Sequence, residues 1–130
     1  MIAAILESGE LERVSTGLSL LVSAAADGRP ACALASYGAL GVLLDDALEA
    51  RALEPAAAPH VADEGRAAFA RTLAELRDTA LAMEGLRIWA CAAAVETTGA
   101  DRALVEARLA GVVSTPRFLR EAAGAELVVL

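Results

Sequence analysis

Apolar and polar residues follow two different rhythms along the chain. Short apolar runs are typical of strands buried in a parallel sheet, whereas apolar residues that recur every three or four positions indicate amphipathic helices. The apolar runs predict strands over residues 2–6, 31–37, 86–90, 112–113 and 127–130. The helical spacing predicts helices between them, over residues 8–27, 39–50, 64–84, 92–98, 101–109 and 114–123.

The regular exchange of strands and helices indicates the fold class. Strands that are separated by helices pair in parallel through right-handed crossovers, so the predicted fold is α/β. A length of 130 residues suits one domain, spanning residues 1–130. Pro55 and Pro59 interrupt an alanine-rich stretch, and segment 53–63 is therefore expected to be a loop and the most mobile part of the chain.

Capping residues mark several helix starts. Ser8, Asp101 and Ser114 each precede a helical segment, and their side-chain oxygens can accept hydrogen bonds from its first free amides. In the last helix, Phe118 and Leu119 are expected to face inward together with Ala122.

The charge balance argues against several classes of partner. The net charge is −7, and the arginines form no basic run, which argues against binding to nucleic acid. No apolar stretch approaches the ~20 residues of a membrane span, so no membrane insertion is expected. The N-terminus has no basic region typical of a secretory signal.

Cys32 and Cys91 are the only cysteines, which favours two free thiols in a reducing, cytoplasmic compartment.

Cys91 is the strongest candidate for chemistry. It directly follows the strand predicted over residues 86–90, and ligands of open parallel sheets bind beyond the carboxyl ends of the strands. If the following alanines turn helical at once, the sulfur lies near unpaired backbone amides, which stabilise a thiolate. Small side chains after Cys91 leave room for a partner to approach. The alternative is that Cys91 is a small buried hydrophobic residue, as many free cysteines are.

The other candidate residues favour structural interpretations. Cys32 occupies an apolar position inside a strand, which indicates packing. His60 is the only histidine and stands in the proline-containing loop, from which it could swing to Cys91 as a base or simply be solvated. Trp89 is expected in the core or at a subunit contact. No cluster of residues has metal-ligand spacing.

Two further patterns carry no predicted site. The acidic residues Asp45, Asp46 and Glu49 are expected to form a solvated helix face rather than a pair of catalytic carboxylates. Gly38 and Gly41 do not form a phosphate-binding loop, so no nucleotide or other cofactor is expected.

Across its whole length the chain resembles the DsrE/DsrF-like family. The resemblance rests on the strand-end cysteine within segment 85–99, on the segments 116–119 and 125–130, and on Tyr37-Gly38 after the second strand. It implies a three-layer α/β/α fold with a five-stranded parallel sheet, similar to flavodoxin in general architecture. It also implies homo- or hetero-oligomers, often trimers or hexamers.

For sulfur-relay members, the resemblance further implies a cysteine that receives and passes on persulfide sulfur, a role that would fall on Cys91. The first hypothesis is therefore a sulfur carrier or sulfurtransferase that works with a donor or acceptor protein. The second is a non-catalytic oligomeric module that binds a small ligand or partner at the strand ends. A third, a flavodoxin-like cofactor binder, is disfavoured because a phosphate loop is absent and stacking aromatics are few.

Overall fold

The computed structural model describes residues 1–130 as alternating strands and helices. The strands are β1 (Ile2–Leu6), β2 (Ala31–Ala35), β3 (Leu86–Cys91), β4 (Val112–Val113) and β5 (Glu126–Val129). The helices are α1 (Leu11–Ala26), α2 (Tyr37–Leu44), α3 (Leu48–Ala52), α4 (Asp63–Ala82), α5 (Ala92–Thr98), α6 (Arg102–Arg108) and α7 (Thr115–Glu121). A short 3-10 helix, η1 (Pro55–Ala57), lies in the connection before α4.

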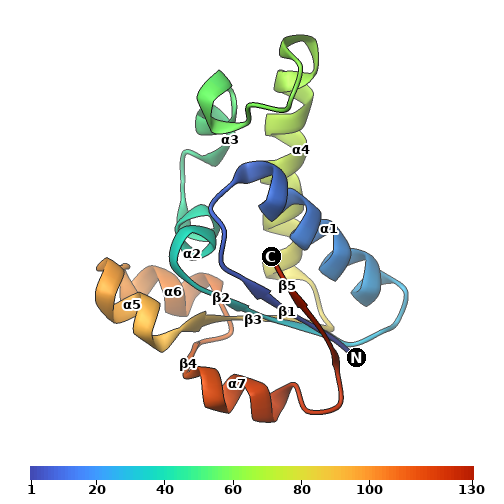
Figure 1. The fold of residues 1–130 in the computed structure, drawn as a ribbon, viewed down its shortest axis with the longest axis vertical. Coiled ribbons are helices and arrows are strands. Elements are labelled where there is room, and N and C mark those ends of the chain that lie inside the picture. The colour runs from blue at the N-terminus through green and yellow to red at the C-terminus, as the bar shows by residue number, and fades with distance from the viewer.

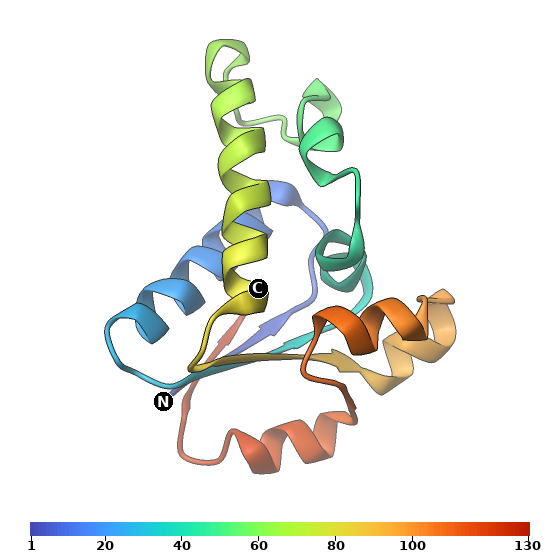
Figure 2. The ribbon, with the colours of Figure 1, turned by 180° about the vertical axis from the view of Figure 1, so that it is seen from behind.

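All five strands form one parallel sheet in the order β4-β3-β2-β1-β5. Helices α1 and α4 cover one face of this sheet, and α7 crosses the other face on its way from β4 back to β5 (Figures 1 and 2). The predicted α/β fold with three layers and a five-stranded parallel sheet is thus confirmed. Because β4 and β5 lie at opposite edges, α7 is the segment that spans the sheet.

Small apolar residues let the helices approach the sheet closely. Every residue of β2 and all of β1 except Ile5 are buried, and alanine supplies three of the five residues of β2 and two of the five of β1. A single apolar cluster of 34 buried residues includes residues from both faces of the sheet. On the α7 face the large group is Phe118, which is fully buried. Its ring meets that of the partly buried Trp89 edge-on, with 6.1 Å between the ring centroids.

The helix predicted over residues 39–50 is wrong, because the structure has two helices there, α2 and α3. Arg77 on α4 explains the break. Arg77 is 7% exposed, and its guanidinium donates hydrogen bonds to the backbone carbonyls of Val42 and Asp45. The Asp45 carboxylate in turn accepts a hydrogen bond from the amide of Ala47 at 2.8 Å, which favours a turn over a continued helix.

Local capping predictions are confirmed at two of the three helix starts. Asp101 accepts hydrogen bonds from Ala103 and Leu104, and Ser114 accepts one from Arg117. Ser8 does not cap α1: its hydroxyl accepts from Glu10, which is itself the N-cap residue.

Two predictions about side chains and strand length are also wrong. Leu119 is 49% exposed, whereas its neighbour Phe118 is buried, because only one side of the short helix α7 contacts the sheet. Strand β2 ends at Ala35, and Tyr37 already belongs to α2.

The connection between α3 and α4, where the most mobile segment is predicted, makes several side-chain hydrogen bonds. The buried guanidinium of Arg66 donates to the carbonyls of Ala58 and Val61. The amide of His60 donates to the carboxylate of Glu12 on α1 at 2.9 Å. These bonds tie the connection to both α4 and α1.

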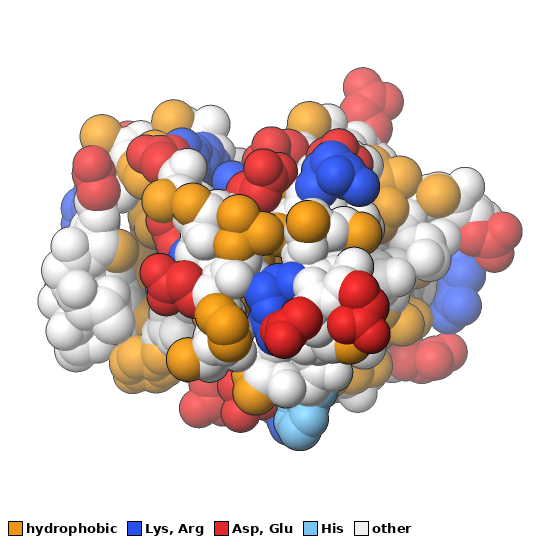
Figure 3. Space-filling view, turned by 90° about the horizontal axis from the view of Figure 1, so that it is seen from above, with side chains coloured by type: hydrophobic (Ala, Val, Ile, Leu, Met, Phe, Trp, Pro, Cys, Tyr) orange, Lys and Arg blue, Asp and Glu red, His pale blue; other side chains and the backbone are white.

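The surface at the top of the molecule as drawn in Figure 1 carries charged side chains of both signs. Figure 3 shows acidic side chains scattered among apolar and neutral atoms, with arginines standing between them rather than forming one basic field. No helix combines the length and the apolar character that crossing a membrane requires.

Candidate functional site

The carboxyl edge of the sheet brings the candidate cysteine to a strand-to-helix junction. Cys91 is the last residue of β3, and α5 begins at the next residue, as the sequence predicts. Cys91 has extended backbone angles and occupies the N-cap position, but its side chain accepts no hydrogen bond from the first turn of α5. The residue is 6% exposed.

The strand register places two polar residues in the same row as Cys91. Ala35 pairs with both Leu6 and Ala90, and the next residues along the chain at these three places are Glu7, Ser36 and Cys91, where β1 and β2 have already ended. The hydrogen bond from the Ser36 amide to the Leu6 carbonyl, at 2.9 Å, continues the β1–β2 ladder to this row. Adjacent strands are about 4.8 Å apart, so Ser36 is the nearest polar residue of the row to Cys91.

Sequence reasoning did not find Glu7 and Ser36. Glu7 follows a predicted strand, which is a signal for the carboxyl edge, whereas Ser36 lies inside the strand predicted over residues 31–37. Only the register relates the two positions to Cys91. Ser36 is 7% exposed and is one of the few buried polar residues, whereas Glu7 is exposed.

The loop after β1 and the first turn of α2 touch each other through two glycines, Gly9 and Gly38. A side chain at Gly38 would place its Cβ 2.6 Å from the amide nitrogen and 2.8 Å from the Cα of Gly9. The amide of Ala39 donates to the carbonyl of Glu7 at 3.1 Å beside this contact. The close approach of the two backbones fixes the positions of Glu7 and Ser36 relative to each other.

We expect Gly38→Ala to destabilise the protein by about 1–3 kcal/mol, because the added methyl group would overlap backbone atoms that cannot rotate away. Gly41→Ala is the matched control: it lies in the same helix, and a Cβ there meets nothing within 4 Å. The control should gain up to about 1 kcal/mol of helix propensity. Urea denaturation measures both effects, and equal stability of the two variants would contradict the proposed overlap.

A cleft opens between α2 and the α5–α6 connection. It has a volume of about 310 Å³, and its lining includes Tyr37, Leu40, Leu104 and Asp101. Tyr37 has a φ of 42°, in the left-handed region that non-glycine residues seldom adopt, and its side chain is 49% exposed. Such backbone conformations cluster at binding and catalytic sites. Cys91 does not line this cleft.

The second cysteine lies toward the opposite end of the sheet. Cys32 is 5% exposed and lines a cleft of about 340 Å³, together with Arg87, Trp89 and Glu121 among others. Burial raises the pKa of the Cys32 thiol above its ordinary value, and the nearby Glu121 carboxylate raises it further. The thiol therefore stays protonated and acts as a packing group at neutral pH.

The histidine and the acidic cluster do not join Cys91. The η1 region that carries His60 lies at the far end of the molecule from α5 (Figures 1 and 2). Asp45 forms an ion pair with Arg51 at 2.8 Å, and Asp46 pairs with Arg108 of α6. The hydrogen bond and charge of Arg108 hold the pKa of the Asp46 carboxyl below its usual range. The two carboxylates thus brace the α2–α3 turn.

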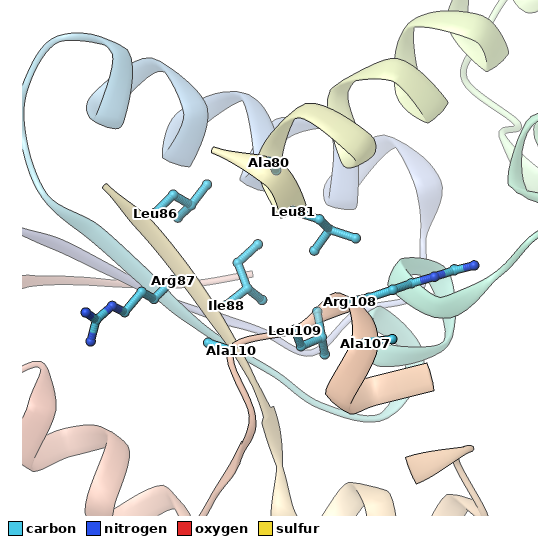
Figure 4. A pocket seen from close by; sticks show the side chains of 9 residues that line it. All are labelled: Ala80, Leu81, Leu86, Arg87, Ile88, Ala107, Arg108, Leu109 and Ala110. Atoms are coloured by element: carbon cyan, nitrogen blue, oxygen red, sulfur yellow. The ribbon is translucent and has the colours of Figure 1, made fainter. Parts of the chain in front are cut away.

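A further hollow forms where β4 is too short to cover β3. The two residues of β4 pair only with Ala90 and Cys91, so the earlier residues of β3 pair with β2 on one side and have no strand on the other. The hollow, of about 260 Å³, lies between this half of β3 and the ends of α4 and α6. Figure 4 shows Arg87 and Arg108 pointing away from its apolar side chains. No charged side chain is therefore aimed at a ligand there.

Groups of three or more metal-ligand side chains do not occur in the structure. No protein-family model and no curated protein matches the chain.

Proposed function

We propose that the protein is a DsrE/DsrF-like sulfur carrier in which Cys91 holds the transferred sulfur as a persulfide. The observation that supports this proposal is the position of Cys91, at the point where β3 passes into α5 on the carboxyl edge of the sheet. This edge is where open parallel sheets bind their ligands. Ser36, which directly follows the adjacent strand β2, would provide a hydroxyl as donor to the sulfur anion.

The transfer would exchange one sulfur–sulfur bond for another. The Cys91 thiolate attacks the outer sulfur of a donor persulfide, a new bond forms between the Cys91 Sγ and that sulfur, and the donor sulfur–sulfur bond breaks. The donor leaves as a thiolate, so no net oxidation occurs and no cofactor is needed. The reverse attack, by an acceptor thiolate on the outer sulfur, would unload the carrier. The donor and acceptor would be partner proteins.

Intact-mass measurement after incubation with inorganic polysulfide tests the proposal. We expect the protein to gain a sulfur atom that dithiothreitol removes, and Cys91→Ser to abolish the gain. Cys32→Ser is the matched control, since it removes the other buried thiol and should leave the gain intact. An adduct that persists in Cys91→Ser and disappears in Cys32→Ser would exclude Cys91 as the carrier.

The cleft beside Tyr37 favours a second candidate, a non-catalytic oligomeric module that binds a small ligand or partner. The cleft opens between α2 and the α5–α6 connection, and its lining is mostly apolar, with the exposed Tyr37 at its rim. Cys91 would then be a packing residue, in keeping with its 6% exposure. Iodoacetamide distinguishes the candidates: a sulfur carrier should alkylate at Cys91 faster than free cysteine near neutral pH, and a packed thiol should alkylate more slowly.

A further inference from the structure

The outer edge of β5 is uncovered. This strand is the last in the sheet, with β1 on one side and no strand on the other. Leu127 and Val129 are 50% and 60% exposed, which is unusual for large apolar residues of a strand. Natural edge strands commonly carry lysine, proline or a bulge that blocks pairing with another chain. Strand β5 has the sequence Glu-Leu-Val-Val and contains none of these.

The backbone of β5 has unpaired groups at the same two residues. The amides of Glu126 and Leu130 donate to carbonyls of Met1 and Ile5, so they point toward β1. Because backbone direction alternates along a strand, the amides and carbonyls of Leu127 and Val129 point away from the sheet. Two donors and two acceptors are therefore presented to whatever lies beside β5.

The side chains of these residues belong to an apolar patch on the α7 face. Leu127 pairs with Ala3, and Val129 pairs with Ile5, so their side chains project on the same face as those of Ala3 and Ile5. Met1 is 43% exposed and lies two positions before Ala3, and side chains two positions apart along a strand project on the same face. Helix α7 packs through Phe118 against Trp89 on β3, and it leaves Leu127 and Val129 exposed.

We propose that β5 pairs with β5 of a second copy of this chain, antiparallel and about a two-fold axis at Val128. In this register, Leu127 of each copy lies opposite Val129 of the other. The outward backbone groups then form four hydrogen bonds between the copies, and β1 keeps all its bonds to β5. Leu127 and Val129 become cross-strand neighbours, a pairing that stabilises sheets. The same surface serves both copies, as a two-fold interface requires.

The charges around β5 permit this arrangement. Glu126 would lie opposite Leu130 of the second copy, so the two Glu126 carboxylates stand at opposite ends of the paired strands. Each is already near an arginine of its own chain, Arg29, at 3.7 Å. The two Glu126 carboxylates do not face each other in this register, whereas a parallel pairing would place them opposite each other.

The area sets the expected strength of the pair. Leu127 and Val129 would together bury on the order of 200 Å² of apolar surface per copy. A standard stable interface buries about 800 Å² per partner. The strand contact is therefore the centre of a small interface, and we expect a dissociation constant in the micromolar range. This inference does not depend on the role of Cys91, and a hexamer with two-fold axes would contain the same contact.

Sedimentation velocity over a micromolar to millimolar concentration series tests the pairing. The natural chain should pass from one copy to a species with an even number of copies. Val129→Pro removes one outward amide and leaves the bonds to β1, so it should weaken association at least ~10-fold. Leu127→Lys places a charge in the pairing and should have a similar effect. Leu53→Lys is the matched control, because Leu53 is 46% exposed but lies outside the sheet and far from β5 in the sequence. This variant should leave association unchanged.

Circular dichroism of each variant confirms that the fold is retained. A chain that stays a single copy at all concentrations, or that forms a trimer, would overturn the proposal. Association that Leu127→Lys weakens and Val129→Pro does not would also overturn it, because the contact would then involve the apolar face and not the backbone of β5.

Discussion

Phe118→Ala should lower the free energy of unfolding by about 3–5 kcal/mol, one of the largest effects of any single substitution in this chain. Phe118 is fully buried and is the largest such side chain, and it holds α7 against the sheet through its edge-on contact with Trp89. Helix α7 crosses this face of the sheet (Figures 1 and 2), and truncating Phe118 would leave a cavity between the helix and the sheet. Denaturation in urea, followed by circular dichroism, measures the loss.

Leu119→Ala is the control for this experiment. Leu119 is the adjacent residue of the same helix and is 49% exposed, so its truncation should cost well under 1 kcal/mol. Tryptophan fluorescence adds a second measurement, because Trp89 is the only tryptophan and loses its aromatic neighbour in Phe118→Ala. Similar losses for both variants would show that α7 does not pack as the structure describes.

Arg77→Ala should destabilise the protein by roughly 2–4 kcal/mol. The guanidinium donates to the carbonyls of Val42 and Asp45 and also to the carboxylate of Asp78. Without it, the last carbonyls of α2 lose their donor in a region that water reaches poorly, and α4 loses its link to the α2–α3 turn. Thermal and urea unfolding measure the effect.

Arg71→Ala is the matched control for the guanidinium. Arg71 lies in the same helix and is exposed, so it tests the loss of helix propensity and charge without the buried hydrogen bonds. We expect its stability to change by less than about 0.5 kcal/mol. If Arg71→Ala cost as much as Arg77→Ala, the carbonyl contacts would not explain the stability.

Local sequence signals were sufficient for much of the fold. The apolar run of β1 predicts its bounds, and the oxygens of Asp101 and Ser114 predict where α6 and α7 begin. These features depend on residues that are neighbours in the sequence. The order of helices and strands likewise gives the parallel sheet, because crossover connections leave few other arrangements.

Features that depend on distant residues were not predictable in this way. The break between α2 and α3 requires Arg77, which lies more than 30 positions further along the chain. The exposure of Leu119 follows from which side of α7 meets the sheet, a choice that a seven-residue helix does not reveal in its sequence. The spacing of apolar residues in the local sequence indicates neither the break between α2 and α3 nor the exposed side of α7.

The candidate site likewise combines features that the local sequence predicts with features that depend on distant residues. The position of Cys91 at the end of β3 follows from the sequence, but its 6% exposure depends on the elements around it. Ser36 and Glu7 follow other strands, and only the register of β1, β2 and β3 relates their positions to that of Cys91. The cleft at Tyr37 depends on the α5–α6 connection, 60 or so positions away.

The position of β5 next to β1 has a consequence for how the chain folds. Ile2 pairs with Glu126, so the contact joins the two ends of the chain, whereas β1, β2 and β3 pair in the order in which they are synthesised. Closing so long a loop costs more conformational entropy than forming the nearer pairs. We expect the β1–β3 core to form first and β5 to dock last, which leaves the edge of β1 open to other chains during folding.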